Sequence, residues 1–367
     1  MKKFLIYCLS ILVPVYVGIS VVNYIVDPGH VYSDAYIDNV VQGLKEGKNV
    51  ANVADLNERS FKEKFIQAHA GEDYDYAIIG ASRVMTLSTD VFDDNRVINL
   101  GMPGSKIEDL IAIYQLCKDN NIKYKNVLLG VEPTYFNAND PDTRWKYLQK
   151  YYDAFMGTQE DQSNLSLLST LFSALSNDAN NDYSKEGADM LLITNLFSVS
   201  YFIAGIKNLI NGDAEVLYVD TPINDGATKR LDGSICYSKA FRDRDQSVID
   251  EGAAYTWMHH SFENFNSLSE ERKVLFGKLI DSLQKDSVNI IFLKGAYHPL
   301  FYKRIIKTGE IIKGDKYLDE FAQKNSIPVF GSINPDDVGL KNTDYYDATH
   351  LRKESLDKLF KDWNIIN

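Results

Sequence analysis

Short apolar segments alternate with segments of helical periodicity along two parts of this chain, and this alternation restricts its fold more than any other feature. Residues 76–80, 97–100 and 127–130 are short apolar runs of the kind expected for buried parallel strands. Between the second and third runs, residues 107–120 carry apolar side chains on one helical face. Strands that alternate with helices in this way predict an α/β domain with right-handed crossovers.

The alternation stops near Asn137 and resumes near Ser269. The second part predicts helices at 269–284, 317–324 and 353–363, and strands at 288–293 and 328–330. Together, the two parts predict a doubly wound domain with a five-stranded parallel sheet. We expect its strands to lie in the order second, first, third, fourth, fifth.

An insert separates the two core parts, which cover residues 74–136 and 269–367. This insert, residues 137–268, is too long to be a structureless loop and predicts a subdomain or lid. Its apolar stretches indicate that it is mainly helical. The turn dipeptide Asp232-Gly233 predicts a loop or hairpin within it.

The first 26 residues have the properties of a membrane-spanning segment. Residues 4–26 are 23 consecutive residues without a charge, enough for a helix of about 35 Å to cross a hydrocarbon core of ~30 Å. Lys2 and Lys3 precede the run, so we expect a single-pass protein with a cytoplasmic N-terminus and an extracytoplasmic domain. No small-residue cleavage site follows, which favours a signal-anchor over a removed signal peptide. Residues 27–73 then predict a juxtamembrane arm with one or two short helices.

Composition excludes several functional classes. The chain has 39 Lys and Arg against 51 Asp and Glu, a net charge of −12, so it has no basic footprint for nucleic acid. Its cysteines, Cys8, Cys117 and Cys236, are too few for a disulfide scaffold or a four-thiolate zinc site. The histidines are widely spaced, and we expect neither a metal ion nor a cofactor.

Two stretches that follow predicted strands could take part in chemistry. Ser82 comes directly after the strand that ends at Gly80, where a helix N-terminus would favour negative charge. A serine at this position also commonly serves only as an N-cap. Residues 99–104, Asn-Leu-Gly-Met-Pro-Gly, could point backbone N–H groups into a cleft, as an oxyanion hole requires, or could form only a tight turn.

A third stretch, Asp347-Ala-Thr-His350, lies just before the last predicted helix. This spacing can place the carboxylate against one imidazole nitrogen and leave the other free to act as a general base. The alternative is a surface Asp that caps the helix, with a neighbouring histidine.

Taken together and in this order, the three stretches resemble the SGNH (GDSL-like) hydrolase superfamily. The resemblance covers about residues 74–136 and 286–364 and implies an SGNH-like fold. It also implies that Ser82 is the nucleophile, His350 the base and Asp347 the carboxylate that orients the base. The spacing from Asn99 to Gly104 is similar to the family's second block, which implies an oxyanion-hole N–H at Gly104 rather than at Gly101.

One position departs from the family pattern. The family's third block usually reads Gly-x-Asn-Asp, and its asparagine completes the oxyanion hole. Here the chain reads Gly130-Val-Glu-Pro133, and an ionised Glu132 cannot donate a hydrogen bond. Glu132 therefore has another role, or it only pairs with a base such as Arg83. Arg83 and Glu132 are both candidates for lining the cleft.

The N-terminal run, the Asn23–Pro28 exit and the Gly-Ala-Ser-Arg block resemble a membrane-tethered SGNH branch associated with membrane-bound O-acyltransferases. This branch includes the D-alanyl transfer protein of teichoic-acid modification and alginate O-acetylation proteins. A Tyr-His-Pro segment of the branch is similar to residues 297–299 and would place His298 at the cleft edge. The alternative for His298 is a structural histidine at a strand end.

The resemblance implies a serine acyltransferase or esterase that O-acylates, with acetyl as the expected group, a cell-surface polysaccharide or cell-wall polymer. A membrane-bound O-acyltransferase is then the expected partner and acyl donor, since an enzyme outside the membrane has no access to cytosolic acyl-CoA. Two alternatives remain open. One is an extracytoplasmic carbohydrate esterase or deacetylase, and the other is an inactive SGNH-like assembly or binding factor.

Overall fold

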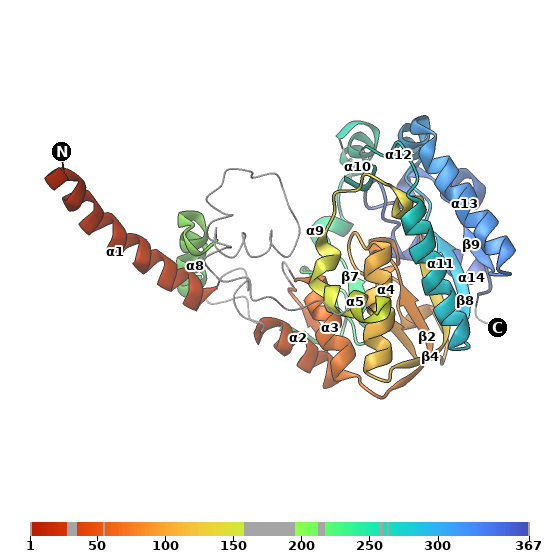
Figure 1. Cartoon of the computed structure of the whole chain (residues 1–367), viewed down its shortest axis with the longest axis horizontal. Helices are drawn as coiled ribbons and strands as arrows, with labels where there is room; N and C mark the ends of the chain where they lie inside the picture. The colour runs from red at the N-terminus through yellow and green to blue at the C-terminus, as the bar shows by residue number, and fades with distance from the viewer. Residues whose placement is uncertain are drawn as a thin grey trace.

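An α/β body and one long helix that extends away from it make up the computed structural model (Figure 1). The structure describes residues 2–27, 35–53, 56–157, 195–211, 217–256, 260–262 and 264–365. The apolar stretch at 165–175 that contributed to the prediction of a helical insert lies outside these residues.

The main sheet has five parallel strands: β2 (Asp73–Ile79), β3 (Val97–Asn99), β4 (Lys123–Val131), β8 (Asn289–Lys294) and β9 (Val329–Gly331). They lie in the order β3-β2-β4-β8-β9, and all their pairings are parallel. In chain order this is second, first, third, fourth, fifth. The predicted α/β class, strand number and strand order are therefore confirmed.

Apolar residues cover both faces of this sheet, which explains why its strands read as continuous apolar runs. Along β2, Ala77 and Ile79 join one core cluster, whereas Tyr76 and Ile78 join another. The first cluster includes residues of α4 (Ile107–Asp119), α11 (Glu270–Lys285) and α13 (Glu310–Lys324). The second includes α14 (Lys353–Asp362). A further helix, α12 (Pro299–Ile305), follows β8 and was not predicted.

Two helices lie in the chain between the apolar N-terminal run and the main sheet, α2 (Ala35–Lys45) and α3 (Glu58–Ala68). Both contribute to the first core cluster, in which Val40 and Phe61 are fully buried. The Arg59 guanidinium of α3 donates to both carboxylate oxygens of Asp109 in α4, at 2.8 and 2.7 Å. These helices therefore belong to the core of the α/β body.

A second, antiparallel sheet was not predicted. It contains β5 (Leu217–Val219), β1 (Asn49–Ala51), β6 (Thr228–Lys229) and β7 (Ile235–Cys236), in the order β5-β1-β6-β7. The β6–β7 hairpin is the one expected at Asp232-Gly233, and Gly233 has the positive φ of +81° that such a turn requires. The described helices between residues 137 and 268 are α5 (Gln149–Met156), α8 (Val199–Asn211), α9 (Lys239–Arg242) and α10 (Gln246–Glu251). The prediction of a mainly helical insert is thus incomplete, because three strands of this sheet come from residues 137–268.

The apolar N-terminal run forms one helix, α1 (Lys2–Val26), and α8 lies beside its C-terminal end (Figure 1). In the part of the chain that the structure describes, no helix is both long and apolar enough to cross a membrane. The membrane span expected for residues 1–26 therefore stays a prediction.

Candidate active site

The candidate nucleophile lies at the carboxyl end of β2, at the start of a short 3-10 helix, η1 (Ser82–Val84). Glycines on two neighbouring strands leave room for this turn. A Cβ on Gly80 would lie 3.0 Å from the Gly130 Cα, and one on Gly130 would lie 2.7 Å from a Val84 methyl. The turn that carries Ser82 therefore packs closely against the end of β4.

Ser82, His350 and Asp347 form a continuous hydrogen-bonded relay. The Ser82 Oγ lies 2.7 Å from the Nε2 of His350. The Nδ1 of His350 lies 2.8 and 3.0 Å from the two carboxylate oxygens of Asp347. Since the carboxylate is an acceptor, Nδ1 carries the proton and Nε2 is free to accept one from the hydroxyl. The structure thus brings together the three residues that the sequence pointed to.

Three-residue spacing produces this geometry because Asp347 also caps its own turn. Its Oδ1 accepts hydrogen bonds from the backbone N–H groups of Thr349 and His350, both at 2.8 Å. Asp347 thus caps its own turn and contacts the imidazole at once, but it does not cap α14, whose N-cap is Arg352. The turn holds the carboxylate in place, and its position orients the histidine ring.

The electrostatics of the relay suit a general base. Burial alone would raise the pKa of Asp347, but the His350 imidazole and the hydrogen bonds to the carboxylate hold it well below its usual range. Burial would also lower the pKa of His350, but Asp347 outweighs this effect and raises it. The side chains of His350 and Asp347 are 20% and 18% exposed, so solvent reaches the pair only in part.

The backbone N–H groups of Ser82 and Gly104 are the candidate oxyanion donors. Within the described residues, no group accepts a hydrogen bond from the N–H of Ser82 or of Gly104. The N–H of Gly101, in contrast, donates to the Asn99 side chain at 2.9 Å. Gly104 is therefore a better candidate than Gly101 for the second oxyanion donor.

Asn99 connects the candidate oxyanion turn to the turn that carries the nucleophile. Its amide nitrogen donates to the carbonyls of Val84 at 2.8 Å and Leu87 at 2.7 Å. Gly104 has a φ of +58°, and a Cβ at this position would lie 2.0 Å from the Nη2 of Arg144. The backbone conformation therefore favours glycine here, and the Arg144 guanidinium would have to move to make room for a Cβ.

Glu132 pairs with Arg83, which is one of the roles left open by the sequence. The Arg83 Nε donates to Glu132 Oε1 at 2.8 Å, and the Thr134 hydroxyl donates to Oε2 at 3.2 Å. Burial would raise the pKa of Glu132, but the charge of Arg83 lowers it, so the carboxylate is ionised. Glu132 therefore offers no donor to an oxyanion.

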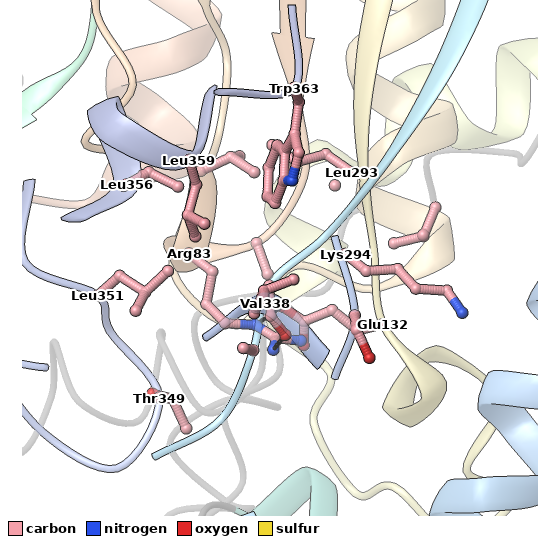
Figure 2. Close-up of a pocket in the computed structure, with 17 residues that line it drawn as sticks. Arg83, Glu132, Leu293, Lys294, Val338, Thr349, Leu351, Leu356, Leu359 and Trp363 are labelled. Carbon is pink, nitrogen blue, oxygen red and sulfur yellow. Dashed lines mark hydrogen bonds and ion pairs between the residues drawn. The ribbon is translucent and has the colours of Figure 1, made fainter. Parts of the chain in front are cut away.

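Arg83 connects the nucleophile turn to the strand ends around it. Besides Glu132 after β4, it donates to the Gly295 carbonyl at 2.6 Å and to the Tyr297 hydroxyl at 3.1 Å, both after β8. Figure 2 shows Arg83 and Glu132 at a small cavity that Leu359 and Trp363 also line. At about 20 Å³ this cavity has room for a single water molecule and is too small for a sugar.

His298 is buried beneath the loop that carries the relay and does not lie on a cleft surface. Its side chain is 0% exposed, and its ring lies 3.2 Å from both Asp250 Oδ1 and the Leu300 N–H. Its backbone N–H donates to the Ala348 carbonyl at 3.0 Å, between Asp347 and His350. The structural alternative accounts for all these contacts.

An aromatic wall beside His350 was missed by the sequence reasoning. The rings of Tyr237 and Phe241 lie 5.9 and 6.3 Å from the imidazole, and Tyr346 packs against both. Tyr237 and Phe241 come from the insert, so the insert forms one side of the site. Their four-residue spacing was visible in the sequence, but nothing there related them to His350.

Among the described residues, no group of three or more His, Cys, Asp or Glu side chains is arranged to hold a metal ion. Neither the protein-family models nor the curated proteins compared with this sequence match it.

Proposed function

We propose that this protein is a serine acyltransferase or esterase of the SGNH (GDSL-like) superfamily that works through an acyl-Ser82 intermediate. The relay from Ser82 through His350 to Asp347 carries this proposal. Its two short hydrogen bonds give the serine a base and give the base an orienting carboxylate.

In the proposed reaction, the Ser82 Oγ attacks the acyl carbonyl while the His350 Nε2 takes the hydroxyl proton. The N–H groups of Ser82 and Gly104 stabilise the oxyanion of the tetrahedral intermediate. His350 then gives the proton to the departing oxygen, which leaves as an alcohol and leaves the acyl group on Ser82. An acceptor hydroxyl or water attacks this ester, again through His350.

The proposed setting is the outer side of a cell membrane, with α1 as the anchor. Tethering keeps the relay at high effective concentration near a membrane acyl donor, which favours transfer to a glycan over hydrolysis. Since acyl-CoA does not reach this side, we propose that a membrane-bound O-acyltransferase supplies the acyl group. The acceptor is a surface polysaccharide or cell-wall polymer, and acetyl is the group we expect.

A host strain that carries Ser82→Ala tests this function through the alkali-labile O-acyl content of its purified surface polymers. Ser60→Ala, a serine of α3 outside the relay, is the matched control. We expect reduced O-acylation in Ser82→Ala and unchanged O-acylation in the control. Increased O-acylation would indicate a deacetylase instead, and no change would indicate an inactive assembly or binding factor.

Co-purification from detergent tests the proposed partner. We expect the O-acyltransferase to co-purify with the intact chain and to be lost when an unrelated span replaces residues 4–26. If it is retained after this replacement, the contact does not run through the helix.

A further inference from the structure

Helix α8 carries an apolar stripe that faces solvent. Val199, Ile203 and Ile210 are 48%, 50% and 76% exposed. They are four and seven residues apart, so they lie along one face of the helix. Lys207 is the single charged residue of α8. The helix therefore has no acidic side chain that an anionic lipid surface would repel.

The opposite face of α8 is held against the end of α1. Gly205 and Tyr201 lie about half a turn around the helix from the apolar stripe, and Gly205 is buried. The Tyr201 hydroxyl donates to Asp27 Oδ1 at 2.7 Å, directly after α1. The apolar stripe therefore points away from α1.

Asn23 also connects the start of α8 to the end of α1. Its side-chain amide donates to the carbonyls of Asn195, Leu196 and Ser198, at 2.9, 3.0 and 2.9 Å. Asn23 is only 1% exposed, although most of the side chains around it on α1 face outwards. Its partners are carbonyls of this same chain, at the residues that lead into α8.

Exposed apolar side chains also lie along α1, on the face turned away from Asn23 and α8. On α1, Val17, Val21 and Ile25 are 55%, 50% and 73% exposed. The two helices stand together, apart from the α/β body (Figure 1). Exposed apolar side chains gathered along both helices mark an interaction site. Because α8 sits where the uncharged run of α1 ends, a bilayer around α1 would meet the α8 stripe at its surface.

We propose that α8 is an interfacial membrane helix, with its Val199, Ile203 and Ile210 face in the headgroup region beside the exit of α1. This inference rests on the proposed membrane location of α1. In such helices the apolar face lies about 5–10 Å into the headgroup and acyl boundary, and a lysine beside it can extend towards water. A second membrane contact restricts the tilt and rotation of the body, so the relay would face the membrane in a limited range of orientations.

Depth-dependent fluorescence quenching tests the proposed membrane contact of α8 in the full chain, reconstituted in palmitoyl-oleoyl phosphatidylcholine vesicles. A Cys8→Ser background leaves only the buried Cys117 and Cys236 as native thiols. Single cysteines replace Ile203 or Ile210 and carry an environment-sensitive nitrobenzoxadiazole label. We expect blue-shifted emission, and a loss of fluorescence when the vesicles contain lipid with a doxyl quencher near the headgroup.

Two further label sites make the outcome decisive. Val17→Cys on α1 reports the membrane location itself, and Val274→Cys, at an exposed position of α11, reports non-specific contact. Quenching at Val17 without quenching at Ile203 and Ile210 would overturn the inference and leave the membrane location standing. Absence of quenching at all of them would overturn the membrane location, and the inference with it. Equal quenching at Val274 would also overturn the inference.

A substitution of Asn23, which hydrogen-bonds α1 to the start of α8, provides a second measurement. Asn23→Leu removes the three hydrogen bonds to the start of α8, so quenching at Ile203 should fall while quenching at Val17 is retained. Ser20→Leu is the matched control, because the Ser20 hydroxyl bonds only to Tyr16 in its own helix. Unchanged quenching at Ile203 in Asn23→Leu would overturn the role given to the Asn23 contacts.

Discussion

At the scale of single residues, the contact between Asp347 and His350 determines how pH acts on the proposed base. Only the neutral imidazole accepts a proton from Ser82, so activity should rise as pH rises through the pKa of His350. Asp347 raises that pKa, so the midpoint should lie above the ordinary histidine value of about 6.5. The hydrolysis rate of a small acetyl ester, measured against pH, gives this midpoint.

Asp347→Asn should lower that midpoint, because the charge that stabilises the imidazolium is lost. It should also lower kcat by about 10⁴-fold, since an amide at this position favours the wrong imidazole tautomer. Asp336→Asn, at an exposed carboxylate outside the relay, should change neither quantity. An unchanged midpoint in Asp347→Asn would show that a group other than His350 sets the pH dependence of activity.

Glu132 can be tested as the ionic partner of Arg83. Replacing it by the asparagine that is usual in the SGNH superfamily, which the sequence resembles, would supply a donor but would leave the buried Arg83 without its ionic partner. We expect Glu132→Asn to lower the free energy of unfolding by about 3–5 kcal/mol and to lower activity as well. Urea unfolding measures the first effect. Glu132→Gln, which keeps an acceptor at the same distance, should be less damaging; faster ester turnover in Glu132→Asn would contradict this account.

Gly104 allows a separate test of the oxyanion hole. Gly104→Ala places a Cβ against Arg144 and strains a backbone with a φ of +58°, at about 1–2 kcal/mol. If the Gly104 N–H binds the oxyanion, its displacement should lower kcat by about 10²–10³-fold. Gly157→Ala is the control, because Gly157 also has a positive φ but has open space around its Cβ. Equal activity in the two variants would exclude the Gly104 amide.

At the scale of secondary-structure elements, α3 contributes to the α/β body as an ordinary core helix. Phe61 is 0% exposed in the main core cluster, although it precedes the first core strand in the chain. Phe61→Ala should therefore lower the free energy of unfolding by about 3–5 kcal/mol, measured by urea unfolding. Val274→Ala, at a 60% exposed position of α11, should change it by less than about 0.5 kcal/mol. Similar values for the two would mean that α3 folds separately from the body.

The elements differ in how well the sequence predicted them, and length is the main reason. β4 has nine residues, and its last five are buried, so periodicity alone identified it. β6 and β7 have two residues each, and β1 pairs with β5 far along the chain. The pairing of β1 with β5 depends on a distant partner that no local pattern reports, whereas the turn dipeptide Asp232-Gly233 indicated the β6–β7 hairpin. α12 was missed because it is short and begins at Pro299.

At the scale of the whole molecule, the sheet topology brings the candidate site residues together. Parallel strands have their carboxyl ends at one edge, so the turns after β2, β3 and β4 meet there. This rule is why Ser82, Gly104 and Glu132 could be grouped from the sequence. It says nothing about side chains that arrive from outside the sheet, and for that reason the position of Tyr237 beside His350 became visible only in the structure.

The same arrangement has a consequence for the time at which a newly made chain acquires its relay. Ser82 and His350 are in hydrogen-bond contact but lie 268 residues apart in the sequence. At the usual rates of synthesis, roughly 15–50 s separate their appearance at the ribosome. The serine therefore emerges long before its base, and the nascent chain has no complete relay until the last residues before α14 have been made. Maturation of the site is thus tied to synthesis of the whole stretch from Ser82 to His350.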